Sequence, residues 1–143
     1  MEHLAQHAPV GTQLIRVAKA HRLWVAGALE RLGLHVGQEL LLAQLCQEEG
    51  VRQGALAHAL GVEPPTVHKM LSRLEAAGFV ERRPDPTDSR ASLTFLTARG
   101  RRTCKQIEAI WRDAEHRLIS DLDVGEVTQI EVLLGRLARD ADT

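Results

Sequence analysis

Aromatic side chains are scarce in this chain of 143 residues, which has two Phe, two Trp and no Tyr. Proteins that bind single-stranded nucleic acids stack bases on exposed aromatic rings. All four aromatic residues of this chain stand within apolar patterns. The composition therefore disfavours a single-strand or RNA-binding surface.

Long apolar runs and cysteines are also few. No run approaches the roughly 20 apolar residues that span a bilayer. The N-terminus lacks the basic-then-apolar order of a signal peptide, so we expect a cytoplasmic protein. The two cysteines, Cys46 and Cys104, stand far apart in the sequence. Such a pair does not make a disulfide framework, and we expect reduced thiols.

Short catalytic motifs are missing as well. The sequence contains no G-x-S-x-G, no G-x-x-x-x-G-K-[ST], no H-E-x-x-H and no G-x-G-x-x-G. These patterns supply the nucleophiles, phosphate-binding loops and metal ligands of common enzyme classes. We therefore expect neither an enzyme nor a bound cofactor.

Positive charge is concentrated in the middle of the chain. Residues 51–105 hold ten Lys or Arg against five Asp or Glu, whereas the whole chain has a net charge of −1. A basic segment between acidic ends indicates a module that binds a polyanion. The length and the 44% of hydrophobic residues suit one domain with a core.

The spacing of apolar residues predicts a mainly helical chain. The expected helices cover 11–33, 36–49, 54–60, 64–77, 97–121 and 125–140. Asp123 is the expected N-cap of the last helix. The expected extended segments are 51–52, 79–83 and 92–96, with a hairpin tip over 84–91. The order α-α-(β)-α-α-β-β-α-α corresponds to a mainly α (α+β) fold.

The helices over 54–60 and 64–77, joined at Gly61, match a helix-turn-helix. Prolines open the second helix, where first-turn amides have no intrahelical acceptor. One of its faces is expected to pack on the core and holds Val67, Leu71, Leu74 and Gly78. The other face suits base edges and phosphates in a DNA major groove. It holds Pro65, Thr66, His68, Lys69, Ser72 and Arg73.

A stiff hairpin directly after a helix-turn-helix is typical of a wing. Pro84 and Pro86 restrict the hairpin, and its aspartates favour turns. Arg90 is placed to enter an adjacent minor groove, where a narrow A·T-rich channel attracts arginine. We expect Asp88 to position Arg90, or a neighbouring arginine, through a charge-assisted hydrogen bond.

The run LSRLEAAGFVERRPDPTDSRASLTFLTARG and the preceding PPTVHKM resemble the MarR (multiple antibiotic resistance regulator) family of bacterial winged-helix repressors. The D-x-R pattern of the wing corresponds to Asp88 and Arg90. The resemblance covers nearly the whole chain. It implies a homodimeric repressor that binds double-stranded DNA at a pseudo-palindromic operator.

The same resemblance implies one domain over 1–143. Dimerisation helices over 11–35 and 97–143 would flank a winged helix-turn-helix lobe over 36–96. Within this lobe, the recognition helix covers 64–78 and the wing covers 79–96.

Two apolar stripes favour the dimer independently. One holds Val124, Val127, Ile130, Leu134 and Leu137, with Leu133 beside them. The other holds Cys104, Ile107, Ile110, Trp111, Ala114 and Leu118. A single chain of this length has little left to cover both stripes, so we expect a second copy to pack on them.

The signal that such a regulator senses stays open at this point. Members of the family respond to small phenolic or lipophilic ligands, to thiol oxidation or to metals. His21, Trp24 and Trp111 are candidate liners of an effector pocket, with ordinary core packing as the simpler interpretation. Cys46 and Cys104 are interpreted as inert buried thiols, and redox activity is the alternative.

A metal site is not expected. His3 and His7 are four residues apart and could share a helical turn, but they stand in an N-terminal arm. The zinc-sensing branch of the family calls for a tight cluster of ligands. This sequence offers only the scattered His21, His35, Glu39 and His116.

A winged helix that docks on another protein is the main rival to DNA binding. Such a module would more often carry acidic or apolar side chains on its groove-facing side. Lys69, Arg73 and Arg90 stand there instead, which favours DNA.

Overall fold

The computed structural model describes residues 1–141, and the side chains of residues 1–139. Its helices are α1 (Glu2–Ala5), α2 (Pro9–Glu30), α3 (Gln38–Gln47), α4 (Gln53–Leu60), α5 (Pro64–Ala76), α6 (Ala98–Leu118) and α7 (Val124–Ala141). Its strands are β1 (Val51–Arg52), β2 (Val80–Asp85) and β3 (Asp88–Leu96). The order confirms the predicted fold, to which the short α1 is an addition. No helix in this part of the chain is long and apolar enough to cross a membrane.

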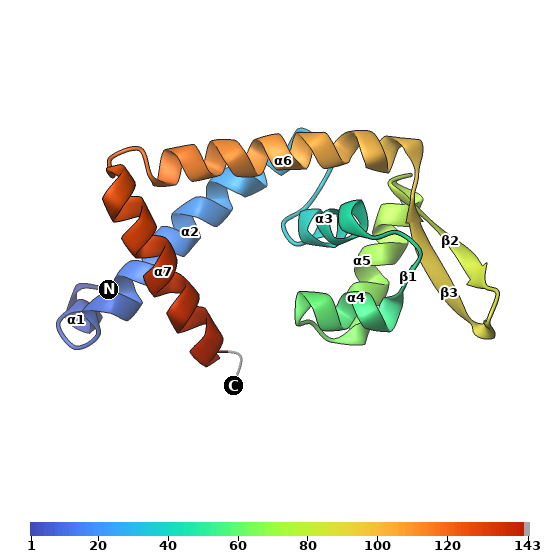
Figure 1. The fold of residues 1–143 in the computed structure, drawn as a ribbon, viewed down its shortest axis with the longest axis horizontal. Coiled ribbons are helices and arrows are strands. Elements are labelled where there is room, and N and C mark those ends of the chain that lie inside the picture. The colour runs from blue at the N-terminus through green and yellow to red at the C-terminus, as the bar shows by residue number, and fades with distance from the viewer. Residues whose placement is uncertain (142–143) are drawn as a thin grey trace.

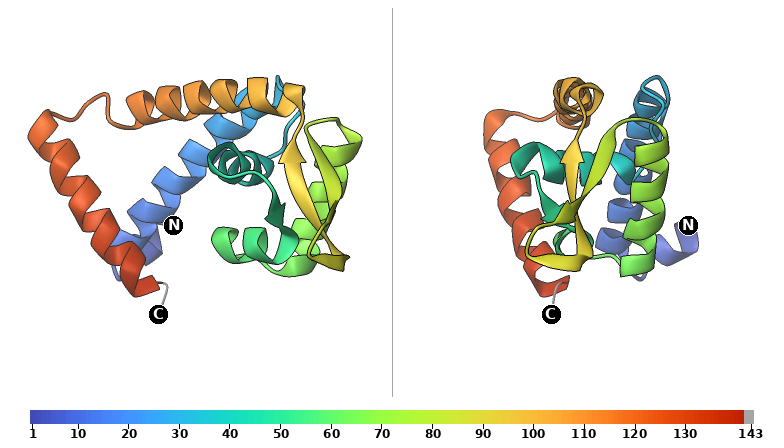
Figure 2. Two further views of the ribbon diagram at one scale, coloured as in Figure 1. Left: turned by 45° about the vertical axis from the view of Figure 1, so that its right-hand side comes forward. Right: turned by 90° about the vertical axis from the view of Figure 1, so that its right-hand side faces the viewer.

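The molecule has a lobe, formed by α3 to β3, and two arms, formed by α2 and α7. The long α6 runs from the lobe to the far end, where α7 begins (Figure 1). In a turned view, α6, α7 and α2 outline a triangle beside the lobe (Figure 2). The three strands form an antiparallel sheet in the order β1-β3-β2.

Helix ends follow local chemistry. Pro9 opens α2, two residues before the predicted start, because proline loses nothing in a first helical turn. The helix ends before Gly33, whose φ is +75°. The predicted cap of α7 is confirmed, since the Asp123 carboxylate accepts a hydrogen bond from the Glu126 amide at 2.9 Å. The Glu126 carboxylate accepts one from the Asp123 amide at the same distance.

The lobe packs around the inner face of α5. Val67, Leu71 and Leu74 are fully buried there, as predicted. Gly78 is exposed, so its predicted place on the packing face is wrong. It lies beyond the end of α5 with φ +81°, and the next amide, that of Phe79, donates to the Leu74 carbonyl at 2.9 Å. Helical spacing does not apply to a residue that terminates the helix in this way.

The wing hairpin is longer than predicted. Its strands reach Asp85 and start again at Asp88, so the tip is not the segment 84–91. Pro84 is the residue that misled the sequence interpretation. It pairs with Ser92 in β2, which is an edge strand, and an edge strand tolerates the missing amide of a proline.

The two cysteines form a disulfide, which contradicts the expected reduced thiols. Cys46 lies in the last turn of α3 and Cys104 lies in α6, and their Cα atoms are 6.2 Å apart. The sequence interpretation failed because packing of α3 on α6 brings together residues that are 58 positions apart. Cys46 is exposed and Cys104 is 8% exposed, so the expectation of two buried thiols fails for Cys46.

The two predicted dimer stripes differ in burial. In α6, Cys104, Ile107 and Ala114 are buried by the chain itself, so the expectation that this stripe lacks cover is wrong over that part. The α6 helix packs on α2 and α3, which supply this cover. In α7, by contrast, Ile130, Leu134 and Leu137 are between 43% and 51% exposed. Only the α7 stripe is largely bare.

Candidate nucleic-acid interface

The outer face of α5 carries the predicted recognition residues. Pro65, Thr66, His68, Lys69 and Arg73 are exposed. Ser72 is half-buried, and its hydroxyl donates to the His68 carbonyl at 3.0 Å. The structure therefore presents these side chains together on one helix face, with Ser72 partly held by the backbone.

Gln53, the first residue of α4, contacts the start of α5. Its Nε2 donates to the Pro64 carbonyl at 3.3 Å. Its Oε1 lies 3.2 Å from Nδ1 of His68. One side chain of α4 thereby contacts both the backbone and a candidate base-reading side chain of α5.

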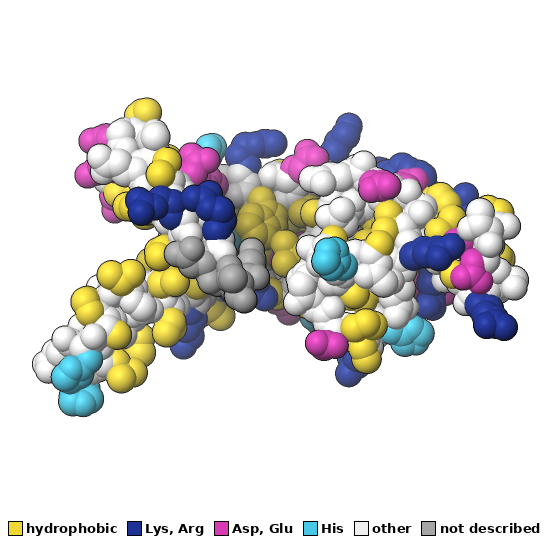
Figure 3. Space-filling view, turned by 60° about the horizontal axis from the view of Figure 1, so that its bottom comes forward, with side chains coloured by type: hydrophobic (Ala, Val, Ile, Leu, Met, Phe, Trp, Pro, Cys, Tyr) yellow, Lys and Arg dark blue, Asp and Glu magenta, His cyan; other side chains and the backbone are white. Residues whose placement is uncertain are grey.

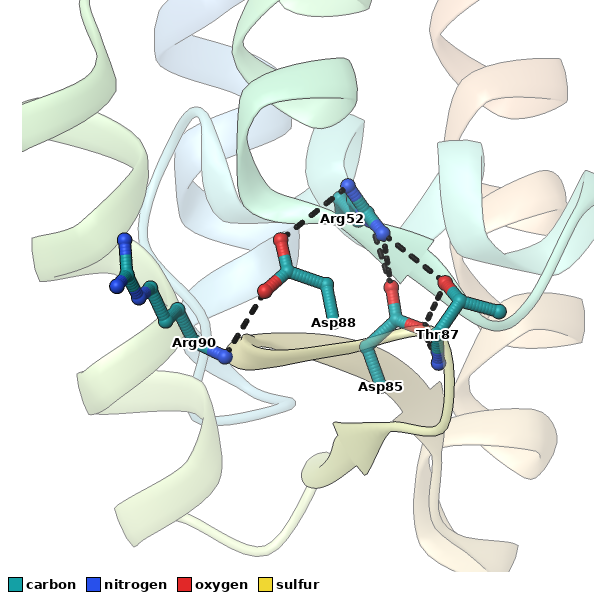
Figure 4. Close-up of polar contacts among 5 residues, drawn as sticks. All are labelled: Arg52, Asp85, Thr87, Asp88 and Arg90. Atoms are coloured by element: carbon teal, nitrogen blue, oxygen red, sulfur yellow. Dashed lines mark hydrogen bonds and ion pairs between the residues drawn. The ribbon is translucent and has the colours of Figure 1, made fainter.

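Arg52, the residue before Gln53, contacts the wing tip. Its Nε donates to Oδ2 of Asp85 at 2.7 Å, and one of its terminal nitrogens donates to the Thr87 hydroxyl at 3.3 Å. The Arg52 guanidinium also lies 4.0 Å from an oxygen of Asp88 (Figure 4). This cluster attaches the tip of the hairpin to β1.

The predicted hydrogen bond between Asp88 and Arg90 is present, and it is made at the backbone of Arg90. Oδ1 of Asp88 accepts a hydrogen bond from the backbone amide of Arg90 at 3.0 Å, and its ion-pair partner is Arg52. The Arg90 guanidinium extends away from Asp85 and Asp88 and is exposed (Figure 4). Asp88 thus orients the backbone at Arg90 and does not hold its guanidinium.

Asp85 is a buried carboxylate at the wing tip. The Thr87 hydroxyl and the Thr87 amide both donate to it, at 2.7 and 2.8 Å. These two hydrogen bonds, together with Arg52, hold the pKa of Asp85 below its ordinary value of 3.8, against the opposing effect of burial. The ionised carboxylate therefore supports the turn at any pH above that value.

Several cations of the basic segment interact with other groups of the same chain. Arg52, Arg82, Arg83 and Arg101 form ion pairs with carboxylates. Arg99 donates to the Ala77 carbonyl and lies 4.2 Å from the centre of the Phe79 ring. Their charge is partly neutralised within the chain.

Lys69 and Arg73 on the outer face of α5, and Arg90 on the wing, have no ion-pair partner among the described residues. Lys and Arg side chains gather over the wing end of the lobe, on the right in Figure 3. Free cations on two adjacent elements can bind a polyanion such as a nucleic-acid backbone.

The predicted effector residues are only partly brought together. His21 and Trp24, with Val17, Ala114, Arg117 and other residues of α2 and α6, line a cavity of about 310 Å³. Trp111 does not line it, although its ring lies 5.3 Å from that of His21. The Arg117 guanidinium lies 4.9 Å from the centre of the Trp24 ring. The cavity is thus mainly apolar, with one cation at its wall.

The histidines considered as metal ligands do not form a site with other ligands. The His3 and His7 rings lie edge to face, with their centres 5.3 Å apart. Glu39 is buried and accepts from the Gly37 amide at 2.6 Å, while His35 and His116 are exposed elsewhere. Within the described part of the chain, no group of three or more His, Cys, Asp or Glu could hold a metal.

Sequence reasoning missed Arg52, Gln53 and Asp85. Arg52 and Asp85 are 33 positions apart, so no local pattern connects them. The Asp-Pro-Thr turn at 85–87 was a usable signal, because aspartate side chains bond the backbone two residues later. Gln53 had no comparable signal.

Comparison with known proteins agrees with this geometry. Residues 34–92 match the model of the MarR family. The chain is 34% identical over 137 residues to the HTH-type transcriptional repressor Rv2887 of Mycobacterium tuberculosis (strain ATCC 25618 / H37Rv), covering 96% of this chain and 99% of that one.

Two solved structures have the same arrangement. One is the Mycobacterium tuberculosis MarR family protein Rv2887 in complex with DNA, with a TM-score of 0.73 and 33% identity over 91% of this chain and 98% of that chain. The other is a mutant MarR of Escherichia coli complexed with operator DNA, with a TM-score of 0.83 and 27% identity over 93% of this chain and 96% of that chain.

Proposed function

This chain belongs to the MarR family, and we propose that it is a transcriptional repressor that binds double-stranded DNA sequence-specifically as a homodimer. The observation that carries the proposal is the set of free cations Lys69, Arg73 and Arg90 on the exposed faces of α5 and the wing. The relatives crystallised with DNA support it. The proposal places the protein in the cytoplasm, with the chromosome, and includes no catalysis.

In the proposed complex, α5 enters the major groove and the wing lies over the adjacent minor groove. Lys69 and Arg73 bind phosphates or base edges, and Arg90 enters the minor groove. The proposed contact residues are Pro65, Thr66, His68, Lys69, Ser72, Arg73 and Arg90. Asp88 contributes by orienting the backbone of Arg90.

The division of the chain follows from this proposal. The whole chain, 1–143, would act as one domain, in which 36–96 is the DNA-binding lobe and 11–35 and 97–143 are dimerisation segments. The exposed stripe of α7 supports this assignment, because two copies would cover each other's apolar side chains. The two recognition helices would then bind half-sites one helical turn, about 34–36 Å, apart or a multiple of it.

Selection of bound duplexes from a random library, at near-physiological salt, tests the proposal. We expect recovery of an inverted repeat and an affinity that falls steeply as salt rises. Recovery of no common sequence, with binding lost at modest salt, would contradict it. That result would favour the rival function, docking of the lobe on a protein partner.

We further propose redox responsiveness as a second candidate property, favoured by the Cys46–Cys104 disulfide. A dithiol reductant would transfer two electrons and two protons to this bond, giving two thiols and a disulfide of the reductant. Cys46 is exposed, so a reductant can reach it. Affinity for the selected duplex, compared before and after reduction, tests this, and equal affinities would contradict it.

For small-molecule control, we propose a small aromatic or lipophilic effector in the cavity lined by His21 and Trp24, which Trp111 does not line. The size and mainly apolar wall of the cavity support such a ligand. Release of the selected duplex by simple phenols, lost in Trp24→Ala, is the expected result. Release that is unchanged in Trp24→Ala would place the effector elsewhere.

A further inference from the structure

His68 is the one imidazole on the proposed DNA-reading face of α5, and its Nδ1 is already engaged. Its Nδ1 atom lies 3.2 Å from Oε1 of Gln53. The Nε2 atom has no hydrogen-bond partner among the described residues, and the His68 side chain is exposed. One ring nitrogen is thus held by the protein and the other is open to a ligand.

The orientation of the Gln53 amide decides which nitrogen of His68 carries the proton. The Pro64 carbonyl lies 3.3 Å from the other end of this amide. A carbonyl can only accept, so the NH₂ group of Gln53 must face Pro64 and its oxygen must face His68. Because that oxygen also only accepts, Nδ1 of His68 must carry a hydrogen.

The neutral imidazole has one N–H and one lone pair. With the hydrogen on Nδ1, the lone pair stands on Nε2. An outward-facing lone pair accepts hydrogen bonds, and in the major groove the donors are the amino groups N6 of adenine and N4 of cytosine. Guanine and thymine offer acceptors at the corresponding positions, and these would repel the lone pair.

We propose that Gln53 is a positioning residue for sequence recognition: it holds His68 in the Nδ1–H form, so that Nε2 accepts a hydrogen bond from the amino group of an adenine or a cytosine. This inference rests on the proposed function, because it assigns one base preference within the proposed major-groove contact. It also gives the β1–α4 junction two tasks, since Arg52 holds the wing and Gln53 holds the recognition helix.

The tautomer can be measured without DNA. Nitrogen-15 chemical shifts of the His68 ring, recorded on the full-length protein at a pH where the imidazole is neutral, distinguish a protonated Nδ1 from a protonated Nε2. We expect a protonated Nδ1 in the wild type and a shift toward the Nε2–H form in Gln53→Leu. The matched control is Gln106→Leu, at an exposed glutamine of α6, which leaves the His68 signals unchanged. A protonated Nε2 in the wild type overturns the inference.

The base preference is then measured by duplex selection with four proteins: wild type, His68→Ala, Gln53→Leu and Gln106→Leu. Loss of preference in His68→Ala identifies the base pair that His68 reads. At that pair we expect the wild type to accept adenine and cytosine at the same place on one strand and to reject guanine and thymine there, because every base pair carries one amino group in the major groove and only its strand discriminates. We expect Gln53→Leu to weaken this selection about 3- to 10-fold, the size that one hydrogen bond supplies, with other positions unchanged.

The outcomes separate the two proposals. If the wild type enriches an operator but His68→Ala changes no position, or if Gln53→Leu keeps the full preference, the inference is overturned while the proposed function stands. If the wild type enriches no duplex, the proposed function fails and the base-reading inference fails with it.

Discussion

The lobe and the arms of this molecule treat their apolar side chains in opposite ways. In the lobe, Leu41, Leu56 and Leu71 are fully buried by residues of the same chain. In the arms, Leu14 is 49% exposed and Leu134 is 43% exposed. Burial of apolar surface is the main favourable term in folding. One chain is therefore sufficient to bury the apolar side chains of the lobe, whereas those of the arms stay exposed and are covered by a second copy only in the proposed dimer.

The cations of the basic segment also differ in whether they are paired with carboxylates. Four arginines of the basic segment are paired with carboxylates, but Lys69, Arg73 and Arg90 on the outer side of the lobe have no such partner within the described part of the chain. The lobe thus keeps its apolar groups inside and its unpaired cations outside. The arms expose apolar groups instead, as the hydrophobic side chains over the left-hand part of Figure 3 show. The two regions are suited to different partners.

The largest expected effect comes from a charge placed in the α7 stripe. Leu134→Asp should separate the two copies, because a buried unpaired carboxylate is costly. Loss of two-site binding then weakens operator binding by about 10²–10⁴-fold. Sedimentation and a DNA titration measure both effects. The control is Gln129→Asp, at an exposed position about 140° around α7 from Leu134. A dimeric Leu134→Asp protein would show that α7 is not the dimer contact.

Reduction of the Cys46–Cys104 disulfide should destabilise the lobe. The bond spans 58 positions of chain, which include α5 and the wing. Closing a loop of this length stabilises a fold by about 4 kcal/mol in the chain-entropy account. Urea unfolding of the wild type with and without reductant measures the loss. The Cys46→Ser variant should have the same stability toward urea as the reduced wild type, and reductant should not change it. Equal stabilities of the oxidised and reduced wild type would contradict the expectation.

Removal of the wing cation should have a smaller, sequence-dependent effect. Arg90→Ala should weaken operator binding about tenfold, mainly at sites with A·T-rich flanks, since a narrow minor groove attracts arginine. Titrations with A·T-rich and G·C-rich flanks measure the difference. Arg112→Ala, which removes an exposed cation of α6, should have little effect on either. If Arg90→Ala lost the same affinity on all flanking sequences, the minor-groove role of Arg90 would be ruled out.

The smallest effect is expected from the wing tip. The pKa of Asp85 is lowered, so its ionised form stabilises the fold above the ordinary value of 3.8, and this contribution is lost as pH falls through the lowered pKa. Asp85→Asn should therefore be less stable than the wild type near neutral pH. The difference in stability between the two proteins should shrink below pH 3.8. Thermal unfolding at several pH values tests this, with Asp113→Asn as the exposed control. A difference that is constant over the whole range would contradict the assigned pKa shift.

The order of elements and the buried face of α5 were predictable because they depend on local patterns. Val67, Leu71 and Leu74 recur at helical spacing, and the prolines and glycines mark the element ends. The wing was predictable as a hairpin, but its length was not. In the sequence, Pro84 favours a turn. In the fold, Pro84 lies in an edge strand, which tolerates proline, and the position of a strand in the sheet is a tertiary property.

The contacts that organise the candidate site were not predictable, because they join residues far apart in the sequence. Arg52 meets Asp85, Gln53 meets His68, and Cys46 meets Cys104 only after the lobe has folded. The sequence predicted which side chains could touch DNA. It also predicted that Asp88 positions Arg90, but it did not predict the contacts that Arg52 and Gln53 make.

The most direct test of this account is the number of chains on the selected duplex. Native mass spectrometry of the complex, formed on an operator with both half-sites, should show two chains per duplex. An operator with one half-site should bind much more weakly. One chain bound per full operator, with undiminished affinity for the half-site, would contradict the account, in which the lobe binds DNA and the arms join two copies.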